Sequence, residues 1–334
     1  MHIFKHANFD FLRWRWQAIG LSWVIILAGV FTIWTKGIPK GVEFAGGTVV
    51  IVQFDQPTSE QQVRATTAKS FPDSIIQAYG DPSLKQVMIR VPSVGAETGT
   101  ALGSEAQKVE AALRAGGLPN FKQVGTEIVG PAVGQELTTK ALLATGLSLI
   151  GILAYLAFRF QFSFGVGAVV ATIHDLLITL AFLAFFRYDM TLNVIAAILT
   201  MTGFSTNDTI VIFDRIRENL RGMRRDSMDH VINASINQTL SRTIITSGTA
   251  LLTALALFFF GGEVLHGFAF TMVVGIITGT YSSVFIAAAI VSFWRGTAPT
   301  RAAAHAPAAM ASALGSAPQQ PQRKQKPQRK ARAS

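Results

Sequence analysis

The sequence contains no cysteine, which excludes a disulfide framework, a thiolate nucleophile and a cysteine-ligated metal site. It is also poor in charge, because only 14% of its 334 residues are charged, whereas a soluble domain usually has about 25%. So few charges cannot cover a globular surface of this size, so the composition excludes an ordinary soluble enzyme. A hydrophobic content of 50% likewise excludes a disordered chain.

A net charge of +10 could indicate nucleic-acid binding, but most of this charge lies in one terminal segment and not on a folded face. The segment from Arg295 to Ser334 carries eight Lys/Arg and no acid, so it supplies most of the excess. The basic character therefore belongs to a tail rich in Ala, Pro and Gln that cannot build a core. Its run 322–332 could bind anionic lipid headgroups, could contact the ribosome or messenger RNA, or could simply be solvated.

Apolar runs long enough to cross a bilayer, about 20 residues each, occur six times. The first is longer than the apolar region of a signal peptide and has no small-residue cleavage site after it, so we expect a retained anchor. The six predicted spans are 17–35, 141–158, 162–186, 190–213, 240–260 and 267–294.

The Lys/Arg residues near the span ends predict the orientation. With six spans, the basic residues before the first, between the second and third, between the fourth and fifth and after the sixth all lie on one side, the cytoplasm. Residues 36–138 and two tight turns, 187–189 and 261–266, lie on the other side. The predicted organisation is a cytoplasmic N-terminus (1–16), a first transmembrane helix (17–35), an exported domain (36–138), transmembrane helices two to six (139–295) and a basic cytoplasmic tail (296–334).

The exported domain has the order β-α-β-β-α-β, which is typical of a ferredoxin-like α+β fold. No catalytic triad, metal-ligand spacing or phosphate loop occurs in it, so we interpret it as a binding or docking module. The strands are predicted at 48–54, 74–79, 86–91 and 121–128, and the helices at 59–70 and 103–115.

Glycines mark both junctions between this domain and the spans. Gly41, Gly46 and Gly47 precede its first strand, where they do not form a dinucleotide-binding fingerprint because no strand precedes them and no helix follows. We expect them to let the chain bend or pack closely. Gly130 and Pro131 mark the corresponding junction before the second span.

Four ionisable residues lie inside predicted spans: His174, Asp175, Asp208 and Arg242. Ionisable groups in a membrane span are functional candidates by default, since each costs a few kcal/mol. Asp208 and Arg242 lie at similar depth and could pair. Helical spacing places Thr246, Thr249 and Thr253 on the same face as Arg242, Ser205 and Asn207 add polar groups near Asp208, and Gly203 and Gly248 would let helices approach closely.

Burial disfavours a charged carboxylate, whereas a neighbouring guanidinium favours it. Movement of Arg242 relative to Asp208 would therefore switch a proton on or off. That is the physical minimum for coupling a proton gradient to a conformational change. A static ion pair between two helices explains the same residues. Similarly, His174 fits either a proton relay or a hydrogen-bonded packing role.

At these residues the sequence resembles the SecD/SecF family of protein-export membrane subunits, and specifically its SecF branch. The resemblance covers about residues 10–295 and excludes the tail. One departure is Phe204, where the family commonly has Tyr. The matching motifs are 203–219 (GFSTNDTIVIFDRIREN), 241–249 (SRTIITSGT), 41–47 (GVEFAGG), 129–131 (VGP) and the pair His174-Asp175.

This resemblance implies a polytopic α-helical protein whose six helices are half of an RND-type transporter, with an inserted ferredoxin-like periplasmic domain. It implies a non-enzymatic subunit in the bacterial inner membrane, without cofactor or metal. With SecD it would use the proton motive force to promote preprotein translocation after insertion by SecA and the SecYEG channel. YajC and YidC are further candidate partners. The implied proton pathway comprises Asp208, Arg242 and Thr246, with His174, Asp175, Asn207 and Thr249 as further candidates.

Two other functions compete with this one. A self-sufficient RND exporter of drugs or lipids normally carries two six-span repeats and two large exported loops, and this chain has one of each. A non-transporting scaffold of the translocon would tolerate Asp208→Asn and Arg242→Lys.

Overall fold

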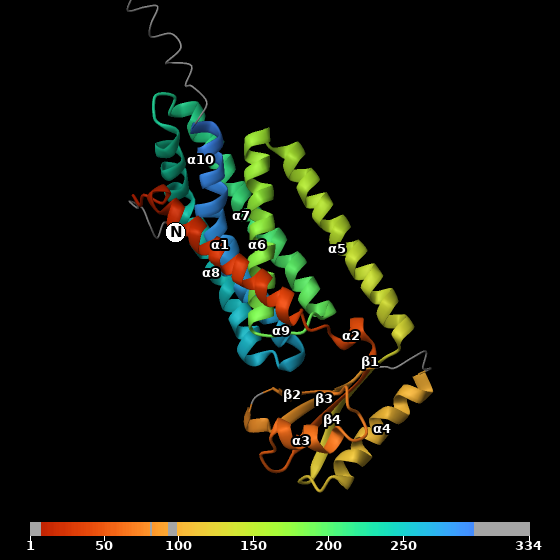
Figure 1. The fold of residues 1–334 in the computed structure, drawn as a ribbon. Coiled ribbons are helices and arrows are strands. Elements are labelled where there is room, and N and C mark those ends of the chain that lie inside the picture. Colours follow the sequence, from red (N-terminus) through yellow and green to blue (C-terminus); the bar gives the residue numbers. More distant parts are fainter. Residues whose placement is uncertain (1–7, 81, 93–98, 297–334) are drawn as a thin grey trace, which may run out of the picture.

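The computed structural model describes residues 8–80, 82–92 and 99–296. Within these residues, six long apolar helices form a bundle, here called the membrane body. They lie side by side, with a small α+β domain at one end of the bundle (Figure 1). The six predicted spans are thus confirmed. The helices are α1 (Arg15–Lys36, after the short η1, Leu12–Trp14), α5 (Pro131–Arg159), α6 (Phe162–Phe185), α7 (Leu192–Gly222), α8 (Met228–Phe260) and α9 (Glu263–Ser282), which continues through a π-helical segment η3 (Ser283–Ala287) into α10 (Ala288–Gly296).

Three helices extend beyond the predicted spans by two turns or more. Helix α7 runs on to Gly222, and α8 begins at Met228, where Ser227 caps it by accepting a hydrogen bond from His230 N (3.3 Å). These extra turns are charged on one side but bury Ile216 and Ile232 on the other, so the two helices continue as an amphipathic hairpin. Helix α5 begins at Pro131 rather than at residue 141.

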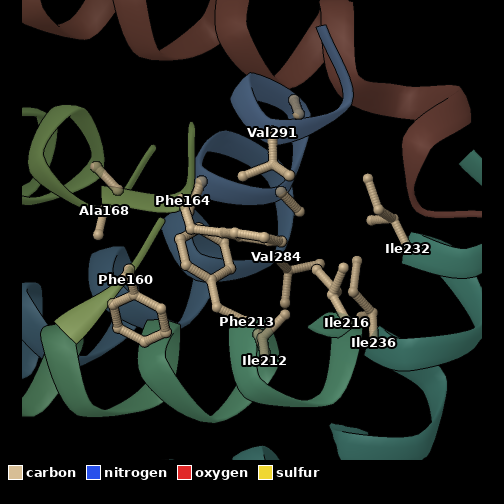
Figure 2. Packing of buried hydrophobic residues seen from close by; sticks show 14 of the residues in the cluster. Phe160, Phe164, Ala168, Ile212, Phe213, Ile216, Ile232, Ile236, Val284 and Val291 are labelled. Carbon is tan, nitrogen blue, oxygen red and sulfur yellow. The ribbon is translucent and has the colours of Figure 1, made fainter. Parts of the chain in front are cut away.

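An aromatic and aliphatic core fills the end of the body that is far from the α+β domain. The ring of Phe213 on α7 packs against Phe164 on α6, with ring centres 5.2 Å apart, and against Phe160 at 6.0 Å (Figure 2). Ion pairs cross the same end, from Arg159 to Asp214 (3.1 Å) and from Arg15 to Asp229 (3.3 Å). Arg15 and Arg159, two of the basic residues expected to share one side of the membrane, therefore lie at one end of the bundle.

The inserted domain, defined here as Gly47–Val129, has the expected β-α-β-β-α-β order. Its antiparallel sheet has the strand order β2-β3-β1-β4. Helices α3 and α4 cover the sheet face that points away from the membrane body (Figure 1), and a capping box at Ser59 begins α3. The elements are β1 (Gly47–Phe54), α3 (Glu60–Thr67), β2 (Ile75–Tyr79), η2 (Pro82–Leu84), β3 (Gln86–Val91), α4 (Gly99–Ala115) and β4 (Phe121–Val129).

The junctions contain one element that the sequence did not indicate, the short helix α2 (Val42–Ala45) between Gly41 and the first strand. Gly46 and Gly47 follow it with positive φ angles of 71° and 123°, which glycine adopts without strain. A Cβ on Gly41 would lie 2.8 Å from the carbonyl oxygen of Met190, so the predicted close approach occurs here. Gly130 is the N-cap of α5 and Pro131 its first residue.

The charged run of the basic tail and the first residues of the chain, 297–334 and 1–7, lie outside the described residues.

Candidate functional site

Asp208 is buried in the middle of α7 and accepts hydrogen bonds from two neighbouring helical elements. Thr243 Oγ1 on α8 donates to Asp208 Oδ1 at 2.8 Å, and Ser283 Oγ in η3 donates to Oδ2 at 2.6 Å. The Asp208 residue as a whole is 7% exposed. Both of its oxygens therefore have neutral hydroxyl partners.

Asp175 on α6 is the centre of a second buried network. Its Oδ2 accepts hydrogen bonds from Ser205 Oγ on α7 (2.5 Å) and from Ser282 Oγ at the end of α9 (2.8 Å). Its Oδ1 lies 2.9 Å from Nδ1 of the neighbouring His174. The other ring nitrogen, Nε2 of His174, is buried and has no partner among the described residues. Asp175 is 1% exposed, so this network is sealed within the helices.

The two networks meet at the π-helical segment of the last span. Ser282 and Ser283 are consecutive, and each donates to a different carboxylate. An α-helix would separate adjacent side chains by about 100°, and the π-helical geometry begins at Ser283. Such π segments occur often at functional sites. A shift of the last span where α9 passes into η3 would therefore act on Asp175 and Asp208 together.

A close contact between α7 and α9 makes this meeting possible. A Cβ on Gly279 would lie only 2.7 Å from the Cβ of Ser205, so only glycine lets the helices come this near. Ser205 and Ser282 are thereby brought to the same carboxylate oxygen.

Asp208 and Arg242, which could pair at their predicted depth, form no ion pair with each other in the structure. Arg242, Thr246 and Thr249 do share one face of α8, as their spacing predicted, but that face is exposed. In the part of the chain that the structure describes, Arg242 forms no ion pair. The Oγ1 atoms of Thr246 and Thr249 donate to carbonyls of their own helix, at 2.9 Å to Arg242 O and 2.9 Å to Ile245 O. The residue that reaches Asp208 is Thr243, one position after Arg242.

Asn207 and Gly203 lie on another exposed face, that of α7, and line a groove beside α5. The groove has a volume of about 520 Å³ and is also lined by Ser148, Gly151 and Tyr155. A Cβ on Gly203 would meet nothing within 4 Å, and the same holds for Gly248. The prediction that these two glycines bring helices together is therefore wrong within this chain.

Sequence reasoning missed Thr243, Ser282 and Ser283, because uncharged hydroxyl residues are common in membrane helices. One signal was available. Tyr281, Ser282 and Ser283 form the most polar run in the otherwise apolar last span.

Comparison with known proteins places this arrangement in a family. The family model described as "Protein export membrane protein SecD/SecF, C-terminal" matches residues 108–297, and "SecD/SecF GG Motif" matches residues 31–58. The chain is 43% identical to "Protein translocase subunit SecF" of Vibrio alginolyticus over 281 residues, covering 84% of this chain and 88% of that protein. It is 38% identical to the Escherichia coli O157:H7 protein of the same name over 284 residues, covering 84% and 86%.

Solved structures agree with the sequence relatives. The crystal structure of SecDF from Thermus thermophilus, described as a translocon-associated membrane protein, matches with a TM-score of 0.77 and 33% identity. The match covers 87% of this chain but only 39% of that one, so this chain corresponds to less than half of the solved protein. SecDF in its Super-membrane-facing form matches with a TM-score of 0.64, also at 33% identity, over 89% of this chain and 40% of the other. The chain belongs to the SecD/SecF family of protein-export membrane proteins.

Proposed function

We propose that this chain is the SecF-type half of a two-part translocation motor. With SecD, in the bacterial inner membrane, it uses the proton motive force to promote preprotein translocation after insertion by SecA through SecYEG. Both termini face the cytoplasm and the inserted domain faces the periplasm. The observation that carries the proposal is Asp208, a carboxyl group buried among membrane helices with only hydroxyl partners.

Hydroxyl partners suit a carboxyl group that gains and loses a proton. A serine or threonine hydroxyl donates to a carboxylate and can rotate to accept from a protonated carboxyl. Thr243 and Ser283 can therefore serve Asp208 in both states. A permanently charged carboxylate at this depth would instead call for a cationic partner.

Arg242 supplies that cationic partner in a second state. Consecutive residues of an α-helix differ by about 100° around the axis. A rotation of α8 of that order would replace Thr243 with Arg242 beside Asp208. The guanidinium would favour the charged carboxylate and so release the proton. Proton binding and helix rotation are thereby coupled.

We infer that SecD binds the exposed face of α8. An arginine with two threonines on a lipid-facing surface is expensive, whereas such groups are common between packed membrane helices. Arg242, Thr246 and Thr249 would therefore face the partner subunit. The solved SecDF chain, of which this chain covers 39%, supports a partner of comparable size.

Translocation into inverted membrane vesicles tests the proposal. The vesicles contain SecD and the channel, and preprotein import is measured with and without an imposed proton gradient. We expect Asp208→Asn to abolish the gradient-dependent part and to leave the ATP-driven part intact. Asp214→Asn is the matched control, because Asp214 lies on the same helix but is exposed and paired with Arg159 at 3.1 Å.

Equal gradient dependence in wild type and Asp208→Asn would overturn the proton-carrier role. The buried networks would then be static locks between helices, and the chain would be a scaffold of the translocon.

A further inference from the structure

The turn between α6 and α7, residues 186–191, fastens the inserted domain to the membrane body. Its Met190 N donates to Pro39 O (2.8 Å), and its carbonyl oxygen accepts from Gly41 N (2.7 Å). The guanidinium of Arg187 donates to the carbonyls of Lys36 (3.2 Å) and Gly37 (3.1 Å). The segment between α1 and α2 is therefore bound along the turn by its backbone.

A buried ion pair connects the inserted domain itself to the turn. Arg90 lies on β3, on the opposite sheet face from Val87, Ile89 and Val91, which contact the domain core. Its Nη2 lies 2.5 Å from Asp189 Oδ2, and its Nη1 donates to Lys40 O at 2.7 Å. The side chains of Arg90 and Asp189 are only 6% and 16% exposed.

Few other contacts would compensate for the loss of the ion pair between Arg90 and Asp189. Arg90 Nε and Asp189 Oδ1 are buried and have no hydrogen-bond partner among the described residues. Removing one member of a buried pair leaves the other charge uncompensated, which is strongly destabilising. The contact between the domain and the turn therefore depends on both charges.

The same turn is also held by the last span. The ring of Tyr188 stacks on Phe270 of α9, with ring centres 4.3 Å apart, and its hydroxyl lies 3.1 Å from Nδ1 of His266. The turn is therefore fixed between the inserted domain and α9.

Both helices that meet at this turn carry the buried carboxylates. Asp175 lies about 15 Å along α6 from its end at Phe185, and Asp208 lies about 24 Å along α7 from its start at Leu192. Chains of packed rigid elements of this kind carry coupling between distant sites. Helix α5, the other connection of the domain, is mostly exposed, since only 6% of its most apolar stretch is buried.

We propose that Arg90 and Asp189 are positioning residues that transmit displacements of α6 and α7 to the inserted domain. The inference rests on the proposed function, because it gives the motor its mechanical output. Protonation of the buried carboxylates would shift α6 and α7, and the clamped turn would move the domain with them.

The test measures domain position and transport separately, in the full chain assembled with SecD. Because the chain has no cysteine, Lys69→Cys in the domain and Val264→Cys at the start of α9 allow spin labels to report their separation. The variants are Arg90→Gln, Asp189→Asn and the charge exchange Arg90→Asp with Asp189→Arg. Arg114→Gln is the matched control, because it breaks an exposed ion pair, to Glu110, within the same domain.

We expect Arg90→Gln and Asp189→Asn to broaden the distance distribution and to reduce gradient-dependent translocation about five-fold. The exchange variant should restore much of both, and Arg114→Gln should change neither. Asp189→Asn changes no side-chain volume, so it keeps the test valid if Arg90→Gln misfolds.

An unchanged distance distribution in both single variants would overturn the inference. So would a broadened distribution with wild-type gradient dependence, because the clamp would then hold the domain without transmitting movement. A wild-type protein that shows no gradient dependence would instead refute the proposed function, on which the inference rests.

Discussion

Both the inserted domain and the membrane body have an apolar core, but the body also buries two hydrogen-bonded carboxyl groups between its helices. In the domain, apolar residues of the sheet and of α3 and α4 form the core. In the body, α6, α7 and α9 meet over small residues such as Gly279 and through hydrogen bonds to Asp175 and Asp208. Water drives apolar groups together, but lipid tails are as apolar as leucine, so close packing and polar contacts hold membrane helices instead. The two regions should therefore respond differently to substitution.

The largest expected effect on stability is in the domain core. Leu113 on α4 is fully buried. Leu113→Ala would leave a cavity and should destabilise the domain by about 3 kcal/mol. Hydrogen exchange of the full chain in lipid nanodiscs would show faster exchange in β1 and β3 and unchanged exchange in α7 and α9.

Leu143→Ala is the control, because Leu143 on α5 is 61% exposed and its truncation leaves no cavity. If Leu113→Ala also accelerates exchange in α7 and α9, the two regions unfold as one unit and the comparison is broken.

A smaller loss is expected from overpacking the body. Gly279→Val would push α9 away from Ser205, costing about 2 kcal/mol, and would draw Ser282 from Asp175. Thermal unfolding in detergent should report the loss, and gradient-dependent translocation should fall with it. Gly248→Val is the control, since a Cβ there meets nothing within 4 Å. Equal melting temperatures for the two variants would show that the close contact does not stabilise the body.

The same difference explains what the sequence could predict. Strand alternation identified the domain, because Val87, Ile89 and Val91 all face one core. Apolar length identified the spans. The orientation of α8 about its own axis could not be predicted from the sequence, because α8 is polar on two sides and either side could face Asp208. Spacing correctly grouped Arg242 with Thr246, but only the packed structure places Thr243 at the carboxylate.

The π-helical segment is a second feature that the sequence could not reveal. An α-helical reading of the last span assigns Ser282 and Ser283 to different faces, so it gives no reason to connect either with a carboxylate. Their contacts with the carboxyl groups depend on the close approach of α9 to α7, and the last span becomes π-helical from Ser283. Both features arise from tertiary packing. The sequence therefore indicated the buried carboxyl groups of Asp175 and Asp208, but neither three of their hydroxyl partners nor the outward position of Arg242.

The smallest expected effect compares the two polar sides of α8 directly. Thr243→Val keeps the shape of the side chain but removes the donor to Asp208, and should destabilise the chain by about 1 kcal/mol. Thr246→Val should change stability little, because its hydroxyl bonds only to its own helix and faces outward. Chemical unfolding of the isolated chain in mixed micelles measures both.

In the complex with SecD, the effect of Thr246→Val should be larger than in the isolated chain. There we expect Thr246→Val to reduce gradient-dependent translocation even though the isolated chain is unaffected, because its face would lie against the partner. Equal destabilisation of the isolated chain by both variants would contradict the distinction between the two sides. Wild-type translocation by Thr246→Val would remove Thr246 from the proton pathway while leaving Asp208 and Thr243 in it. Thr246 would then serve only the contact with SecD, and Arg242 would be the residue of the exposed face that takes part in the proton cycle.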